Sequence, residues 1–132
     1  ASKLVYSPHD YPNSIYPNSW FEGPNFKENL PNVFREHWGF IFEEGIAPIF
    51  LGEFGTKLLD SRDIAWLDEL TQYLNGDFNT DGVLDIPDTQ EGMSFAYWSW
   101  NPNSTDTGGI LRDDWITVHQ HKLDALESIL IG

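Results

Sequence analysis

The sequence predicts an α/β fold in which three β-strands alternate with three α-helices. Two observations predict it. Short β-rich or apolar runs alternate with segments of helical periodicity, and the central run is nearly continuously apolar, as expected of a parallel strand covered on both faces. A chain of 132 residues with 40% hydrophobic content can form one core. We therefore assign residues 1–132 to a single domain.

The first predicted strand covers residues 3–7 and ends at Pro8, where a polar loop rich in Pro and Asn begins and continues to Pro31. From Asn32, helical spacing predicts an amphipathic helix that Gly45 can end. The side chains expected on its apolar side are Val33, Phe34, His37, Trp38, Ile41 and Phe42.

Residues 47–54 form the second predicted strand, in which Glu53 is the only acid and stands near the far end. The next helix is predicted over residues 61–74, with Asp60 or Ser61 as its N-cap. Its buried face is expected to carry Ile64, Leu67, Leu70 and Leu74.

An acidic loop separates that helix from the third predicted strand, residues 93–100, and the last helix is predicted over residues 115–131. Three strands leave the edges of a sheet open, and three helices are too few to cover both faces. We therefore expect the chain to be part of a larger sheet. The carboxyl ends of the three strands run into polar, aromatic or acidic side chains: His9, Tyr11, Glu53, Trp98 and Trp100.

The charge of the chain excludes two classes of partner. Twenty-one acidic and seven basic side chains give a net charge of -14, which repels phosphate backbones and anionic lipid headgroups, so we expect no nucleic acid and no membrane partner. The absence of cysteine excludes disulfides and thiol chemistry. The aromatic content of 15% fits either a packed core or a sugar-binding surface, where aromatic rings stack on pyranoses and amides bind hydroxyls.

Four segments carry a resemblance to a known family: LVYSPHDYPNSIYPNSWF, APIFLGEFGT, FAYWSWNPNSTDTGGILRDDW and YLNGDFNTDGVLDIPD. They resemble segments of the cellulases of glycoside hydrolase family 5, whose fold is a TIM barrel, and the resemblance extends over nearly the whole chain with order and spacing preserved. The resemblance implies that the three βα units are strands 6–8 of a (β/α)8 TIM barrel. Such a piece is incomplete without an N-terminal partner chain.

The resemblance also implies roles for three residues at the strand ends. Glu53 corresponds to the nucleophile of a retaining mechanism, in which a carboxylate attacks the anomeric carbon and water hydrolyses the covalent intermediate. His9 and Tyr11 match the His-x-Tyr pair of the family, and alternation along a strand points both toward the same side. There the Tyr11 hydroxyl can donate to Glu53 and keep it ionised.

Further residues are expected to bind the substrate. Trp98 matches the tryptophan that forms the floor of the subsite for the sugar to be cleaved, whereas Trp100 is expected to be a neighbouring packing residue. No catalytic role is assigned to His37, His119 or His121. Four residues in the two long loops either line the cleft or stabilise their loops, and the sequence leaves this open: Trp20, Asn101, Ser104 and Asp106.

A retaining mechanism needs a second carboxyl about 5–5.5 Å from the nucleophile, acting first as acid and then as base. In the family this glutamate follows an asparagine at the end of the fourth strand, and the chain has no such Asn-Glu pair. We therefore expect an N-terminal fragment of the same barrel to supply the acid/base Glu. The chain alone is expected to be inactive.

The acidic loop has the spacing of an EF-hand-like calcium site, with Gly82 at the position of the sharp turn. Against it, position 12 is Asp rather than Glu and no helix follows. A structural Ca²⁺ and a solvated acidic loop both remain open, and no cofactor is expected for catalysis. The predicted ligands are Asp77, Asn79, Asp81, Val83, Asp85 and Asp88.

The favoured function is that of a secreted endo-β-1,4-glucanase that hydrolyses internal bonds of cellulose or related β-glucans and cello-oligosaccharides. Secretion is implied by the polymeric substrate rather than by any targeting segment. A β-mannanase or xylanase on the same barrel is the nearest alternative, since the loops decide the substrate. A non-catalytic, calcium-stabilised carbohydrate-binding module using Trp20, Trp98 and Trp100 is the alternative from another class.

Overall fold

The computed structural model describes residues 3–130, so Ile131, the end of the predicted last helix, lies outside the described part. The helices and strands alternate as predicted after a largely irregular N-terminal segment. They are α1 (Phe26–Phe34), a π-helical turn (Arg35–Gly39), α2 (Phe40–Glu43), β1 (Phe50–Phe54), α3 (Ser61–Asn75), β2 (Ser94–Tyr97) and α4 (Gln120–Leu126), with 3₁₀ turns at Ser19–Phe21 and Glu127–Ile129.

The two strands are parallel neighbours, and Phe50 lies opposite Ser94 and Phe54 opposite Tyr97. This confirms the predicted parallel pairing of the second and third strands. The third strand is shorter than predicted, because the chain leaves β2 after Tyr97 and turns into a long loop.

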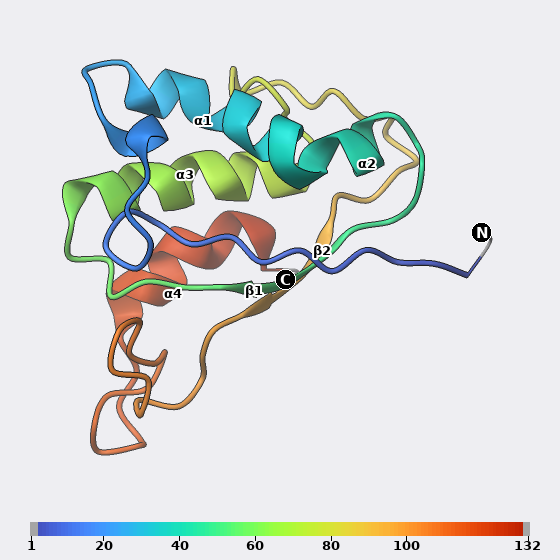
Figure 1. Cartoon of the computed structure of the whole chain (residues 1–132). Coiled ribbons are helices and arrows are strands. Elements are labelled where there is room, and N and C mark those ends of the chain that lie inside the picture. The colour runs from blue at the N-terminus through green and yellow to red at the C-terminus, as the bar shows by residue number, and fades with distance from the viewer. Residues whose placement is uncertain (1–2, 131–132) are drawn as a thin grey trace.

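The prediction of a regular first strand over residues 3–7 is wrong. The segment runs parallel to β1 but meets it only at isolated bridges, Tyr6 with Ile49 and His9 with Glu53. Pro8 lies between the two bridges and has no N–H to donate, which interrupts the ladder. Figure 1 shows this N-terminal segment extended along β1.

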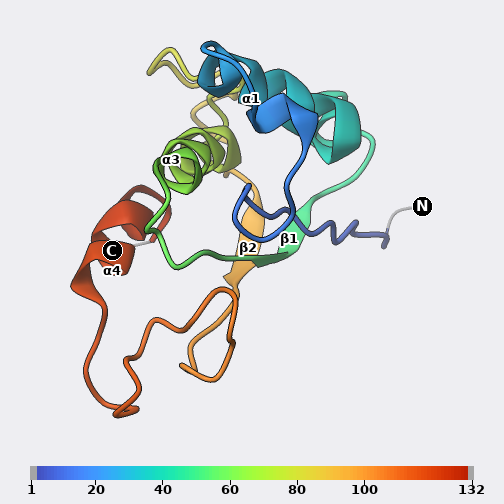
Figure 2. The ribbon, with the colours of Figure 1, turned by 60° about the vertical axis from the view of Figure 1, so that its left-hand side comes forward.

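The helices gather on one side of the strands, and the long loop between β2 and α4 extends away from them (Figure 2). The core lies between the helices and the strands. Most of its fully buried members come from three elements and include Leu51 and Phe54 of β1, Trp66, Leu70 and Tyr73 of α3, and Leu30 and Phe34 of α1.

The first helix starts at Phe26, not at Asn32 as predicted. Pro31, which was interpreted as the end of the preceding loop, lies inside α1. Pro31 is the sixth residue of α1, past the first turn, so the helix continues through a position at which one backbone N–H bond is missing. The end is confirmed: α2 stops at Glu43, and Gly45 adopts the left-handed conformation (φ +65°) that a glycine tolerates best. His37, expected on the apolar side, is exposed.

The helix α3 is close to its predicted bounds. Its N-cap is Asp60, whose carboxylate accepts a hydrogen bond from the Arg62 N–H at 2.8 Å. Ile64 was expected on the buried face but is 50% exposed. The buried stripe instead includes Trp66 and Tyr73, whose large rings fill the space against the strands and α1.

The last helix begins at Gln120 rather than at residue 115. Residues 111–118 instead form an antiparallel turn, in which Leu111 bridges Val118 and the Arg112 N–H donates to the Thr117 carbonyl at 2.7 Å. Asp114 stabilises this turn by accepting from the N–H groups of Ile116 (3.0 Å) and Thr117 (2.8 Å). Trp115 lies in that turn with φ +61°, a left-handed conformation outside the helical region.

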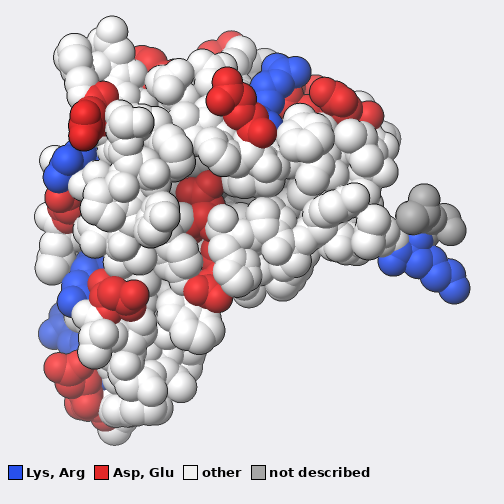
Figure 3. Space-filling model, in the orientation of Figure 1, with Lys and Arg blue, Asp and Glu red and all other residues white. Residues whose placement is uncertain are grey.

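Within residues 3–130, none of the helices combines the length and the apolar character needed to cross a bilayer. The charged side chains are spread over the surface, and Figure 3 shows a largely uncharged face with acidic side chains set in a hollow near its middle.

The packing of α3 on β1 predicts that Leu70→Ala lowers the free energy of unfolding by about 2–5 kcal/mol, because Leu70 is fully buried and the change leaves a cavity. Urea denaturation of the protein measures this. Leu59→Ala is the matched control, since Leu59 is 79% exposed, and it should change the free energy by less than about 0.5 kcal/mol. Equal effects of the two changes would contradict the packing described.

Candidate active site

The carboxyl ends of the three parallel segments meet at one edge, as the sequence predicted. The Asp10 N–H donates to the Glu53 carbonyl at 3.1 Å, and the Trp98 N–H donates to the Phe54 carbonyl at 2.7 Å. These backbone bonds place His9, Glu53 and Trp98 on adjacent segments. In α/β folds with parallel strands, this edge is where functional side chains gather.

The carboxylate of Glu53 is held by two neighbours from the N-terminal segment. The Tyr11 hydroxyl donates a hydrogen bond to Oε1, and Nδ1 of His9 lies 3.5 Å from Oε2. The side chain of Glu53 remains 26% exposed, so one part of the carboxylate is supported and another part faces solvent. The predicted convergence of His9 and Tyr11 on Glu53 is confirmed.

Tyr11 is kept as a proton donor by its surroundings. Burial raises the pKa of the Tyr11 phenol, and the hydrogen bond to Glu53 and the charges of Glu53 and Asp106 raise it further. The phenol therefore stays neutral at all ordinary pH values. A neutral hydroxyl donates to the ionised form of Glu53 and stabilises it.

Two glycines on either side of Glu53 allow the segments to approach closely. A Cβ added at Gly52 would lie 2.3 Å from Oγ of Ser7, and one added at Gly55 would lie 1.8 Å from the Trp98 carbonyl oxygen. Neither position can hold a larger residue without displacing a neighbour. The Gly-Glu-Phe-Gly sequence is thus a packing requirement for placing Glu53 beside Trp98.

Trp98 borders a pocket of about 350 Å³ with Trp100, Asn101 and Ser104. Both indoles are open to solvent, with exposed fractions of 46% for Trp98 and 62% for Trp100. The interpretation of Trp100 as a packing residue is therefore wrong. Exposed aromatic faces beside amides and hydroxyls form a surface on which a sugar ring can stack.

Ser104 and Asp106 make hydrogen bonds within their own loop. The Ser104 hydroxyl donates to Asp106 Oδ1 at 2.7 Å, and the Thr107 N–H donates to the same oxygen at 2.8 Å. These bonds lower the pKa of Asp106. The sequence left open whether these residues line the cleft or stabilise their loop. The structure shows that Ser104 and Asp106 both stabilise the loop, and that Ser104 also borders the pocket of Trp98.

Lys122 of α4 holds the same loop through two hydrogen bonds. It is 3% exposed, and its ammonium donates to the carbonyls of Thr107 at 3.0 Å and Gly109 at 2.9 Å. Burial lowers the pKa of Lys122 to about 8, and the charge of Lys57 contributes to the shift. No sequence signal marked this lysine, since a lone Lys in a predicted helix is expected on the surface.

Trp20 lies in a second pocket, of about 220 Å³, that His9 and Tyr11 also line. Its ring is 5.1 Å from the ring of His37 between centroids, in a tilted arrangement. His37, to which the sequence assigned no catalytic role, lines this pocket beside His9. The structure therefore brings Trp20 to the Glu53 side of the N-terminal segment but into a different pocket from Trp98.

Asp10 is a half-buried acid that no sequence pattern marked. Its two carboxylate oxygens accept hydrogen bonds from the indole N–H groups of Trp66 (2.8 Å) and Trp38 (2.9 Å). Burial raises the pKa of Asp10 from 3.8 to about 6, although the two indole bonds and the charge of His37 lower it. The only sequence signal was its position between His9 and Tyr11, which alternation places on the opposite face.

The acidic loop forms turns in which its carboxylates accept from backbone N–H groups. Asp77 accepts from Asp81 and Gly82, at 3.1 and 2.7 Å, and Asp85 accepts from Phe78 at 2.7 Å. Among the residues that the structure describes, no group of three or more His, Cys, Asp or Glu side chains converges as a metal site. The calcium site stays a prediction from spacing, and no step is assigned to it.

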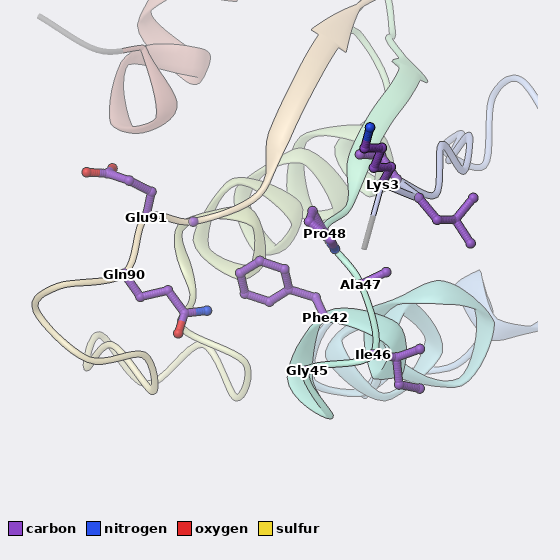
Figure 4. Close-up of a pocket in the computed structure, with 11 residues that line it drawn as sticks. Lys3, Phe42, Gly45, Ile46, Ala47, Pro48, Gln90 and Glu91 are labelled. Carbon is purple, nitrogen blue, oxygen red and sulfur yellow. The ribbon is translucent and has the colours of Figure 1, made fainter. Parts of the chain in front are cut away.

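A pocket of about 590 Å³, larger than either of those beside Trp98 and Trp20, lies elsewhere (Figure 4). Leu4, Phe42, Ile46 and Pro48 line it, at the amino end of β1, whereas Glu53 stands at the carboxyl end. Its lining carries no pair of acids or nucleophiles. The size of a pocket is thus a poor guide to the chemistry of this chain.

Comparison with known proteins decides the family. The sequence pattern of the family described as cellulase (glycosyl hydrolase family 5) matches residues 1–104. The chain belongs to glycosyl hydrolase family 5. An endoglucanase of Paenibacillus polymyxa is 37% identical over 131 residues, and the major extracellular endoglucanase of Xanthomonas campestris is 39% identical over 131 residues. Each match covers 98% of the chain but only 30% and 24% of the respective relative.

Solved structures of family 5 agree with the fold. An endocellulase from Pyrococcus horikoshii, crystallised as a Glu-to-Ala variant with cellotetraose, superposes with a TM-score of 0.78 at 37% identity, covering 95% of this chain and 31% of that one. The catalytic domain of the Xanthomonas campestris enzyme gives 0.77 at 38% identity, covering 96% and 33%. The predicted fold class, a part of the barrel of family 5 endoglucanases, is confirmed.

The raised pKa of Asp10 predicts a defined pH dependence. An unfolded Asp10 loses its proton near pH 4, whereas the folded one holds it to about pH 6. The stabilisation is therefore present below pH 4 and is lost as the pH rises through 6. The melting temperatures of the wild type and of Asp10→Asn are measured by circular dichroism. The wild-type value minus the variant value should fall between pH 4 and 6 and then remain level. A difference that is constant over this range would contradict the shift.

Proposed function

We propose that this chain carries the nucleophile of a retaining endo-β-1,4-glucanase. The observation that carries the proposal is the geometry at Glu53, whose carboxylate accepts from Tyr11, lies beside His9 and stays partly open to solvent. A carboxylate that is oriented at the end of an apolar strand and remains accessible from solvent is suited to attack a carbon centre.

In the proposed reaction, Glu53 attacks the anomeric carbon as the bond to the leaving-group oxygen breaks, and a covalent glycosyl-enzyme forms. Water then attacks the same carbon and releases Glu53, so the configuration is retained. Tyr11 stays protonated throughout and orients the carboxylate. His9 supports the second carboxylate oxygen and is exposed enough to contact the sugar.

The second carboxyl of the mechanism is proposed to come from an N-terminal part of the same barrel. Within residues 3–130, the hydrogen bonds and ion pairs of Glu53 involve no other carboxyl. The chain spans about a third or less of the relatives it matches. Exposed apolar side chains along the N-terminal segment and at the start of β1 support a covering partner there: Leu4, Val5, Tyr6, Ile46 and Phe50. We propose that the chain alone is inactive.

The proposed substrate is cellulose or a related soluble β-glucan, bound with a sugar stacked on Trp98. Variants of the Pyrococcus horikoshii endocellulase were crystallised with cellotetraose, which supports a β-glucan oligosaccharide as the ligand of this chain too. Trp20, Asn101, Ser104 and Asp106 are proposed to border the cleft. The extracellular Xanthomonas campestris relative supports secretion.

Glu53→Gln in the intact protein that contains this chain should lower kcat on a soluble cellulose derivative by about 10³-fold or more, about 4 kcal/mol in the barrier, because the amide cannot attack the anomeric carbon. Reducing-end release measures this. Glu44→Gln is the matched control, since Glu44 is an exposed acid at the end of α2, and its activity should equal that of the wild type.

The alternatives make different predictions in the same assay. A non-catalytic carbohydrate-binding module would bind the polymer without releasing reducing ends in either variant. A β-mannanase or xylanase would show the Glu53 effect on mannan or xylan and not on cellulose. Full activity of Glu53→Gln on cellulose would reject the proposed nucleophile.

Trp98→Ala should raise KM for cello-oligosaccharides by about 10-fold, about 1.4 kcal/mol, because the exposed indole offers a stacking face beside Glu53. Steady-state kinetics on oligosaccharides of increasing length measures this. Trp115→Ala is the control, because Trp115 is exposed to a similar extent but does not line the pocket of Trp98. An unchanged KM in Trp98→Ala would remove Trp98 from the proposed subsite.

A further inference from the structure

The side chains of residues 9, 10 and 11 point alternately to two opposite faces of the N-terminal segment. The side chains of His9 and Tyr11 both contact the carboxylate of Glu53, whereas the side chain of Asp10 contacts the indoles of Trp38 and Trp66. Alternation along an extended segment produces this division. The backbone of residue 10 therefore connects the helix layer with the catalytic carboxylate.

The Asp10 carboxylate contacts two buried tryptophans, one through each oxygen. Trp66 of α3 is 0% exposed and Trp38 of the π-helical turn is 4% exposed, so neither indole N–H has water as an alternative partner. Each oxygen of the carboxylate serves one of them, at 2.8 and 2.9 Å. One ionised carboxylate thus ties the N-terminal segment to two helical elements at once.

The same residue is bonded to the strand of the nucleophile. The Asp10 N–H donates to the Glu53 carbonyl at 3.1 Å, between the side chains of His9 and Tyr11. Pro8 has no N–H to donate, but backbone hydrogen bonds on both sides of it hold the segment to β1: the Phe50 N–H donates to the Tyr6 carbonyl and the Gly52 N–H to the Pro8 carbonyl, both at 2.9 Å. The side-chain bonds of Asp10 to the helices add to these backbone bonds at the end of the segment that carries His9 and Tyr11.

We infer that Asp10 is a positioning residue that fixes His9 and Tyr11 against Glu53 by anchoring their segment to Trp38 and Trp66. This inference rests on the proposed function. The ionised carboxylate is retained there despite its burial, which raises its pKa and opposes ionisation. A neutral side chain of the same size would avoid that burial cost but could not accept from both indoles.

The experiment uses Asp10→Asn in the intact family 5 protein, because the amide keeps the size of the side chain and accepts from one indole only. We expect kcat on a soluble cellulose derivative to fall about 10-fold while KM changes less than about 2-fold. The acidic limb of kcat/KM should shift to higher pH, because a displaced Tyr11 stabilises the ionised Glu53 less.

Two comparisons separate positioning from a loss of stability. Tyr73→Phe removes a buried hydroxyl that donates to Glu43 between α3 and α2, and it should lower the melting temperature without moving kcat or the acidic limb. In the Tyr11→Phe variant, adding Asp10→Asn should shift the acidic limb of the kcat/KM pH profile no further. Asp10 is inferred to act through the Tyr11 hydroxyl, which this variant already lacks.

The outcomes also separate this inference from the proposed function. If Glu53→Gln is inactive but Asp10→Asn affects only the melting temperature, as Tyr73→Phe does, Asp10 is structural and the inference is overturned while the nucleophile stands. If Glu53→Gln stays active, both the proposed nucleophile and the inference about Asp10 are rejected. A lower kcat and a shifted limb in folded Asp10→Asn, both absent from Tyr73→Phe, support the inference.

Discussion

The placement of one carboxylate, that of Glu53, at the end of a buried strand is the constraint on which the rest of the structure depends. A charge at the edge of an apolar core is stable only when donors reach it, and here Tyr11 and His9 come from a neighbouring segment. Bringing that segment and β2 close enough excludes side chains at Gly52 and Gly55. The core of α1, α3 and β1 holds these backbones at that spacing.

Features that depend on local pattern could be predicted from the sequence. The strand of Glu53, the cap at Asp60, the end at Gly45 and the convergence of His9 and Tyr11 follow from periodicity, capping chemistry and alternation. Two errors have local causes. An antiparallel turn forms over residues 111–118 where helical spacing continues, and Pro31 lies within a helix, although the sequence predicts that a loop ends there.

Long-range contacts could not be predicted, because no pattern within a short window encodes them. Asp10 lies 28 and 56 residues from its two indole partners, and Lys122 reaches carbonyls 13 and 15 residues away. Ile64 is exposed because the bulk of Trp66 and Tyr73, rather than regular spacing, decides which side of α3 faces the strands. The roles at the site follow from three-dimensional partners that the sequence shows only as isolated polar residues.

The burial of Lys122 affects how this protein can be immobilised through its amines. Its amine is enclosed beneath the loop that carries Trp98 and Ser104, whereas Lys57 is exposed. Reagents that acylate surface amines reach Lys57 and leave Lys122 in place. Immobilisation on an amine-reactive support therefore preserves the anchor of this loop, while small aldehydes that penetrate during partial unfolding would release it.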